Sequence, residues 1–267
     1  MGVSLMKCKQ LAALALVLCL GLSLAACNLK PAAPWPETLK PGKRVQGNGR
    51  MSSDTDINEF MRGQEWTLRV EVARFTPGVC KIVVDESLDF AGKLETDSNI
   101  KAGLIHEYNL QKSEIVLRGE PNQWYAPTVL NFTVGVPVNK IILNGALSID
   151  YNCPSVTDCV IEINGASEGK FTFGALDTLR VDVNGTGSVT LAGAAKLADL
   201  TINGAANIKG FDLIAEAASA FINGAGSCEI TATGTLDAEI NGLGKVVYGG
   251  EPAVSKRIQG LGEVKAR

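Results

Sequence analysis

An Asn-Gly dipeptide recurs through the second half of this 267-residue chain at nearly constant intervals. Successive asparagines lie 20, 20, 19, 20 and 18 residues apart, and a Gln-Gly pair follows after 18 more, at Asn144, Asn164, Asn184, Asn203, Asn223, Asn241 and Gln259. On both sides of each dipeptide, apolar residues alternate with other residues, which is typical of β-strands. The interval therefore predicts one unit of structure, two short strands and a bend, that repeats in space.

Two all-β folds fit such a unit. Asn-Gly commonly forms the two-residue turn of a β-hairpin, which would give an antiparallel meander. A meander needs a turn after every strand, however, and only one Asn-Gly occurs in each interval of about 20 residues. An interval of this size matches one coil of a β-solenoid, in which coils stack and bury a continuous apolar interior. We therefore predict a right-handed parallel β-helix, with marked repeats over residues 141–267.

The repeat predicts which side chains face the interior. The residue before each bend should point inward, in the column Leu143, Ile163, Val183, Ile202, Ile222, Ile240 and Ile258. After the bend, an outward column is expected at Ser148, Glu168, Ser188, Asn207, Ser227, Lys245 and Glu263. The next position points inward again, so Cys228 should be a buried thiol. Residues 212–221 are rich in alanine and have helical propensity, but the register of the repeat predicts strand or bend there.

Composition supports the same interpretation. Of 29 glycines, 19 lie between Gly135 and Gly262, where each bend is expected to need a positive φ. The stacked asparagines at the bends should form a ladder of side-chain amides, a structural role. The 46% hydrophobic content is sufficient for a packed core, and 25 Lys+Arg against 28 Asp+Glu provide no basic surface for nucleic acid.

Residues 66–138 lack Asn-Gly but contain four runs typical of strands, at 68–72, 80–84, 114–117 and 129–134. Two interpretations remain open for this region. It forms either divergent first coils or a β-rich cap over one end of the solenoid.

The amino terminus predicts export. Lys7 and Lys9 precede an apolar run from Leu11 to Leu24, which is too short to span a bilayer as a helix. The run ends in Leu24-Ala25-Ala26-Cys27, which resembles the lipobox of bacterial lipoproteins, although an ordinary secretory signal is the alternative. We expect a signal peptide over 1–26, lipid on Cys27, a Pro-rich tether over 27–50 and a β-helical domain over 51–267. By the same resemblance, Asn28 favours the outer membrane.

Four cysteines remain after export and lipidation: Cys80, Cys153, Cys159 and Cys228. Cys153 and Cys159 flank a short loop, and in an oxidising compartment they are candidates for a disulfide. A zinc site is the rival interpretation, but no histidine lies nearby and a set of four ligands is not visible. No metal or other cofactor is expected.

The repeats resemble a known family. The segments are 222–226, Ile-Asn-Gly-Ala-Gly, and 239–244, Glu-Ile-Asn-Gly-Leu-Gly, with the endings at 248–253 and 258–264. They are similar to the bacterial head GIN domain, also described as an auto-transporter adhesin domain, over about residues 64–267. The resemblance implies an exported β-helical protein and carries over no catalytic residue. Gln259 in place of asparagine, and the segment from Cys153 to Cys159, depart from the family pattern.

An enzyme must still be weighed, because parallel β-helices include polysaccharide lyases and hydrolases, which need converging acidic or basic groups. Glu162, one coil from Asp182, is the one acidic pair in the outward column two residues before the bends, and solvated surface charge is its simpler explanation. His106 is the single histidine, and Trp124, Tyr125 and Phe221 are aromatic groups that could stack on sugars. None of these forms a convergent set, so no catalytic residue is assigned.

The leading hypothesis is a non-catalytic, lipid-anchored envelope protein. It would bind the membrane through its lipid and present one side of the solenoid to a polysaccharide or protein ligand, as an adhesin does. The alternatives are a structural envelope component and a carbohydrate-active β-helix enzyme.

Overall fold

The computed structural model describes residues 43–46, 48–56, 65–72, 79–85, 92–119, 123–126 and 130–267. Residues 42–267 form one compact unit. The predicted signal peptide, the lipidation site Cys27 and the tether up to residue 42 lie outside the described residues. Within those residues the chain is almost entirely β-strand, and the single helix is the short α2 (Ser98–Lys101).

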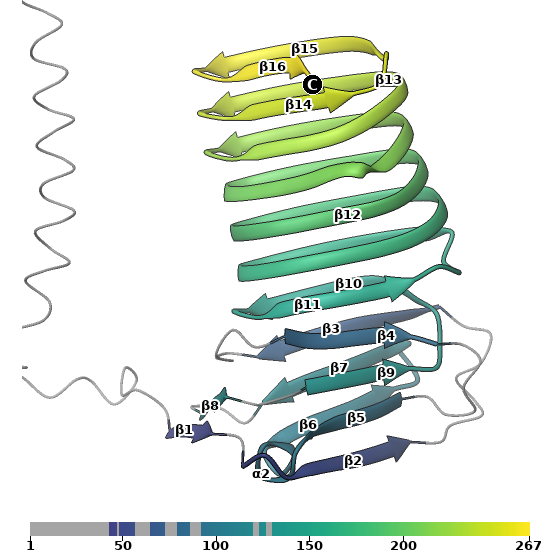
Figure 1. The fold of residues 1–267 in the computed structure, drawn as a ribbon, viewed down its shortest axis with the longest axis vertical. Coiled ribbons are helices and arrows are strands. Elements are labelled where there is room, and N and C mark those ends of the chain that lie inside the picture. The colour runs from purple at the N-terminus through teal and green to yellow at the C-terminus, as the bar shows by residue number, and fades with distance from the viewer. Residues whose placement is uncertain are drawn as a thin grey trace, which may run out of the picture. The chain divides into compact units, whose positions relative to one another are not determined.

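The marked repeats form stacked coils of parallel strands, as Figure 1 shows from teal to yellow. One strand of each coil runs into the bend and a second strand leaves it. We call the sheet of incoming strands face A and the sheet of outgoing strands face B. These strands are β10 (Val138–Gly145), β11 (Ser148–Cys153), β12 (Asp158–Gly224), β13 (Ser227–Gly242), β14 (Lys245–Gly249), β15 (Ala253–Gly260) and β16 (Glu263–Ala266). The fold is thus the predicted β-solenoid and not an antiparallel meander.

The pairing register follows the repeat. Asn144 pairs with Asn164 on face A, and Ser148 pairs with Glu168 on face B. Asn223 likewise pairs with Asn241, which pairs with Gln259. Equivalent residues of successive repeats therefore lie next to each other, and the alanine-rich 212–221 lies within β12 as strand, as the register predicted.

The predicted inward column is confirmed from Leu143 to Ile240, because each of its side chains is at most 1% exposed. The exception is Ile258, which is 39% exposed. It has the inward position, but β15 pairs only with β13 among the described strands, so none of them covers its outer side. Val264 of the same coil is also only partly buried. The interior is otherwise continuous, and aromatic side chains of one cluster, Tyr151, Phe171 and Phe173, pack tilted against each other.

The region before residue 138 combines both expected structures. Four strands add two more coils: β3 (Trp66–Val72) and β7 (Glu114–Gly119) extend face A, while β4 (Val79–Val84) and β9 (Leu130–Val134) extend face B. Their order in space differs from their order in the chain, because β3 lies between β7 and β10. The coil formed by β3 and β4 is therefore inserted between two coils that follow it in sequence.

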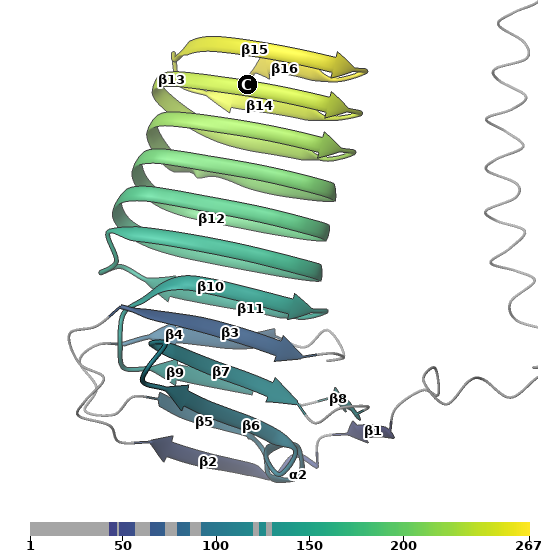
Figure 2. The same ribbon diagram turned by 180° about the vertical axis from the view of Figure 1, so that it is seen from behind.

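Antiparallel strands cap this end of the solenoid, as both views show in Figures 1 and 2. On face B, β5 (Gly92–Asp97) pairs with β9, and β2 (Met51–Asp56) pairs with β5. On face A, β6 (Leu104–Asn109) pairs with β7. Ile100 of α2 is fully buried and contributes to the core at the capped end.

The folded unit begins earlier than predicted. We expected a tether up to residue 50, but β1 (Lys43–Gln46) pairs in parallel with β8 (Gln123–Ala126). The backbone N–H of Gly49 donates to Oδ1 of Asp97 at 2.7 Å. Proline and glycine in this segment suggested a linker, whereas its bonds to distant residues hold it against the capped end.

The bend glycines explain the spacing of the repeat. Gly185 has a φ of +150°, and a Cβ atom placed on it would overlap the carbonyl oxygen of Gly165 in the preceding coil. The asparagine before it has a negative φ, since Ser113 is the sole non-glycine residue with positive φ in the described part of the chain. The bend is therefore not the hairpin turn that Asn-Gly usually forms, which needs positive φ at both residues. It is a corner where backbones stack closely.

We predict that Gly185→Ala lowers the free energy of unfolding by more than about 3 kcal/mol, because backbone strain of about 1–3 kcal/mol adds to steric overlap. The measurement is chemical denaturation followed by circular dichroism. Gly49→Ala is the control, because Gly49 has a φ of +71° and no atom within 4 Å of the added Cβ. It should lose only about 1–2 kcal/mol from strain. Equal losses would show that close stacking at the bend is not what requires glycine.

Candidate functional site

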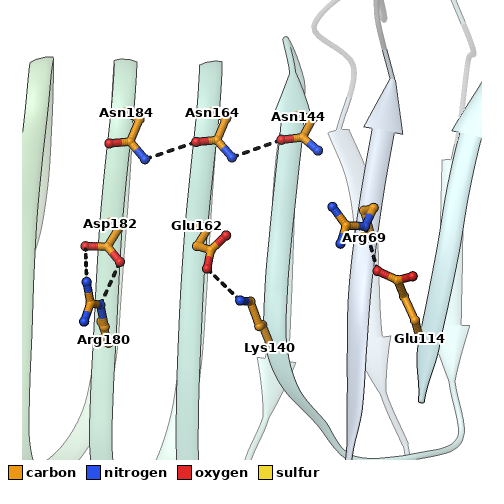
Figure 3. Close-up of polar contacts among 9 residues, drawn as sticks. All are labelled: Arg69, Glu114, Lys140, Asn144, Glu162, Asn164, Arg180, Asp182 and Asn184. Atoms are coloured by element: carbon orange, nitrogen blue, oxygen red, sulfur yellow. Dashed lines mark hydrogen bonds and ion pairs between the residues drawn. The ribbon is translucent and has the colours of Figure 1, made fainter. Parts of the chain in front are cut away.

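The bend asparagines form a ladder along the edge of face A (Figure 3). Nδ2 of Asn164 donates to Oδ1 of Asn144 at 3.0 Å, and Asn184 donates to Asn164 at 3.1 Å. Asn203 donates to Asn184 at 3.0 Å. The ladder ends there, because the Asn223 side chain forms no hydrogen bond with any described residue, and Asn241 donates to Glu239 at 3.3 Å. These amides are engaged with one another, so the ladder is a structural device that links coils rather than a site for a ligand.

The acidic pair singled out from the sequence lies on face A, and each member has its own basic partner (Figure 3). Oε1 of Glu162 lies 2.7 Å from Nζ of Lys140. Oδ2 of Asp182 accepts from Nε of Arg180 at 2.8 Å, and this hydrogen bond raises the pKa of the arginine. A carboxylate that bonds a neighbouring cation is not free to contact a substrate, as a general acid must. Surface ion pairing therefore explains both residues.

Three more ion pairs lie on face A or at its margin. The distances between nitrogen and oxygen atoms run from 2.6 to 3.6 Å in Arg69 with Glu114, Lys196 with Asp177, and Arg257 with Glu239. A groove of about 670 Å³ lies over the capped end of this face. Its charged lining is also paired, since Arg69 bonds Glu114 and Arg118 bonds Glu107, both at 2.7 Å.

Face B differs from face A, because four charged side chains in its middle form no ion pair with a described residue. Lys81 of β4, Asp150 of β11 and Lys170 of β12 are neighbours in register. Lys209 lies further along the same face, in β12. None of these four side chains forms an ion pair or a hydrogen bond within the part of the chain that the structure describes. They are exposed or half-buried and lie side by side without neutralising one another.

Two shallow grooves follow these residues across face B. One, of about 360 Å³, is lined by Glu168, Lys170 and Lys209 together with Ser188 and Thr190. The other, of about 420 Å³, is lined by Lys81, Asn152 and Thr172. Asp150 and Lys170 line both grooves, which are therefore adjacent. The arrangement offers donors and acceptors to a long polar ligand and contains no aromatic platform.

Sequence reasoning missed this surface. The spacing of 20 residues between Asp150 and Lys170 places them in one column, which the repeat could have revealed. Lys81 could not have been added, because the coil that carries it is inserted out of chain order. The unpaired state of the charges also depends on side-chain positions that a repeat does not specify.

The remaining candidates do not converge on a site. His106 lies in β6 of the cap, and Trp124 and Tyr125 lie in β8, but their side chains are outside the described part of the structure. Phe221 is half-buried in β12 and has Glu239 as its strand partner. Among the described residues, no group of three or more His, Cys, Asp or Glu side chains could hold a metal ion.

The cysteine side chains that the structure describes are buried. Cys153 and Cys159 are free thiols in the structure, and burial together with the nearby Cys153 raises the pKa of Cys159 above its ordinary value. Burial, with a smaller effect of Glu229, raises the pKa of Cys228 to about 12. A thiol reacts as its thiolate, so Cys228 is a core residue as predicted and not a nucleophile. A disulfide between Cys153 and Cys159 stays a prediction.

We predict that Asn184→Ala lowers the free energy of unfolding by about 1–2 kcal/mol, because it removes two hydrogen bonds of the ladder. Asn223→Ala is a matched control at the equivalent bend, since the Asn223 side chain forms no hydrogen bond with any described residue. Its unfolding free energy should change by less than about 0.5 kcal/mol. Urea denaturation of both variants makes the comparison, and equal effects would contradict a stabilising ladder.

The described residues contain no helix long and apolar enough to cross a membrane. A search of curated protein sequences gives no significant match.

Solved structures match over 84% of this chain and show the fold. An adhesin, named as putative, from Bacteroides fragilis NCTC 9343 is 21% identical with a TM-score of 0.68, and all of it is covered. A protein from Parabacteroides distasonis ATCC 8503, named as a putative lipid binding protein, is 20% identical with a TM-score of 0.56 and is also fully covered.

A family model matches residues 78–252, which is more than half of the chain. Its description is "Putative auto-transporter adhesin, head GIN domain". The match includes the inserted coil from β4 onward, the cap strand β5 and the bends up to Asn241, so it spans both the divergent and the regular coils. The resemblance seen in the bend segments is thereby confirmed, and the chain belongs to the head GIN domain family.

Proposed function

We propose that this protein is a non-catalytic binding module of the cell envelope, anchored by lipid on Cys27, that holds a polysaccharide or protein ligand along face B. The observation that carries the proposal is the contrast between the two faces. On face A, Glu162 bonds Lys140 and Asp182 bonds Arg180, whereas Lys81, Asp150, Lys170 and Lys209 on face B form no bond with any described residue.

Unpaired surface charges favour ligand binding for an energetic reason. A charged ligand group that binds Glu162 or Asp182 on face A must displace the cation already paired with it. A ligand group that binds Lys170 or Lys209 on face B displaces only water. Shallow grooves that join at Asp150 and Lys170 suit an extended chain more than a compact molecule. Strands recur about every 4.8 Å along the solenoid, so one ligand chain can contact several coils.

The non-catalytic part of the proposal rests on the chemistry of the candidate acids. Glu162 and Asp182 each form an ion pair, with Lys140 and Arg180 respectively. Hydrolysis of a glycosidic bond needs two carboxyl groups that flank the bond and are free to contact it. The family description and the name of the Bacteroides fragilis structure also favour adhesion over turnover. Release of reducing sugars or unsaturated products from polygalacturonate by the purified protein would overturn this part.

We predict that the double variant Lys170→Gln and Lys209→Gln reduces retention on the ligand at least about tenfold, the loss expected when charged contacts of an interface are removed. The probes are immobilised heparin, polygalacturonate, collagen and a cell-envelope fraction, read by surface plasmon resonance. Lys140→Gln with Arg180→Gln is the matched control, because it removes the same charge from face A. If both double variants bind like the parent protein on the probe that the parent recognises, or lose binding equally, face B is not the binding surface.

The anchoring part has its own test. Cys27→Ser should release the protein from the membrane fraction into the soluble fraction, because the replaced thiol can no longer carry lipid. Phase partitioning of lysates in Triton X-114 measures the change, with Cys19→Ser as the control that leaves the lipidation site intact. Retention of the Cys27→Ser protein in the detergent phase would contradict lipid attachment at Cys27.

A further inference from the structure

One end of the solenoid is capped, and the other end has no cap among the described residues. At the amino-terminal end, β2, β5, β6 and α2 cover the first coils. At the other end, β15 pairs only with β13 and β16 only with β14 among the described strands, as the yellow coil shows in Figure 2. The outer backbone edges of β15 and β16 thus have no neighbouring strand, and such an edge is a template for pairing with another chain.

Apolar side chains accompany the open edge. Val254 and Ile258 occupy inward columns, since their strand partners are the buried Leu236 and Ile240. They remain 37% and 39% exposed because no strand of the described residues covers them. Leu261, beside the last bend, is 83% exposed. One further strand on face A would cover Val254 and Ile258 and would complete the hydrogen bonding of β15.

A lysine stands in the middle of this apolar row. Lys256 pairs in register with Ala238, which is fully buried, and thus has an inward position between Val254 and Ile258. It forms no ion pair or hydrogen bond with any residue that the structure describes. A strand that covered the row would remove this ammonium group from water, which is costly unless the strand supplies an opposite charge.

The charge decides between two occupants of the edge. If two copies of this chain joined by their open ends, both Lys256 side chains would enter the same buried layer, and like charges there are unfavourable. A strand of a different protein with a carboxylate opposite Lys256 avoids this cost and gains a charge-assisted hydrogen bond. The lysine therefore opposes self-association and favours an acidic partner.

We propose that β15 accepts one extended strand from a partner protein, in which a Glu or Asp faces Lys256 and apolar residues two positions to each side cover Val254 and Ile258. The strand adds to face A by backbone hydrogen bonds, as in β-strand addition. Its specificity comes from the alternation of apolar, acidic and apolar side chains on one side. This surface lies at the end of the solenoid and is separate from the face B surface proposed above.

The test uses the full chain and labelled peptides of sequence Thr-Val-Thr-Glu-Thr-Val-Thr, whose symmetric pattern suits either strand direction. Fluorescence polarisation should show binding of this peptide and binding at least about tenfold weaker for the same peptide with Lys in place of Glu. Lys256→Glu should reverse the preference. Lys265→Glu is the matched control, because Lys265 lies on the last coil but bonds Glu263 at 3.2 Å, and it should leave the preference unchanged.

Binding of neither peptide, or equal binding of both, would overturn the proposal. So would a preference that Lys256→Glu does not reverse, provided that circular dichroism shows the variant folded. Sedimentation velocity supplies the remaining outcome: a dimer of the unmodified protein that Lys256→Glu abolishes would make a second copy the occupant, and it would contradict the proposal as well.

Discussion

Successive coils of this solenoid are in close backbone contact where one bend glycine lies over the next. At Gly185 the carbonyl oxygen of Gly165 occupies the space that a Cβ atom would need. This contact recurs at nearly constant spacing, and the strand segments that flank the bends pair in the register of the repeat. Register in turn places apolar residues over apolar residues and amide over amide, so the core and the asparagine ladder both depend on the same corner.

The part of the fold that could be predicted from the sequence is the part in which Asn-Gly marks each bend. In the coils that contain Asn-Gly, the interval between repeats predicts which residue of the next coil lies beside each residue, and the alternation of apolar residues predicts which side chains face inward. Leu143 and Cys228 are therefore buried as predicted, and residues 212–221 form strand as predicted. Before residue 138 that marker is missing. The insertion of β3 between β7 and β10 depends on long-range pairing, such as the bond from the Trp66 N–H to the Pro137 carbonyl, which no local pattern encodes.

The candidate surfaces lay beyond sequence reasoning for a related reason. A repeat predicts which side chains face outward, but whether outward charges bond each other depends on rotamers and on neighbours in adjacent coils. Glu162 has Lys140 beside it and is engaged, whereas Asp150 lies between Lys81 and Lys170 and is not. Ile258 has the pattern of a core residue and is exposed, because a column needs a coil on both sides. Function in this fold is thus expected where the repeat is incomplete or its charges are unmatched.

Removing one whole coil tests most directly whether stacking at the bends determines the fold. Deletion of residues 186–204 joins Gly185 to Ala205 and keeps every column in register, so we predict a folded protein. That protein should show the circular dichroism of the parent and a cooperative unfolding transition with a smaller dependence on urea, in proportion to the surface lost. Deletion of residues 195–204 removes half a coil, breaks the columns and should unfold the domain. An unfolded whole-coil deletion, or two deletions of equal stability, would show that stacking at the bends does not determine the fold.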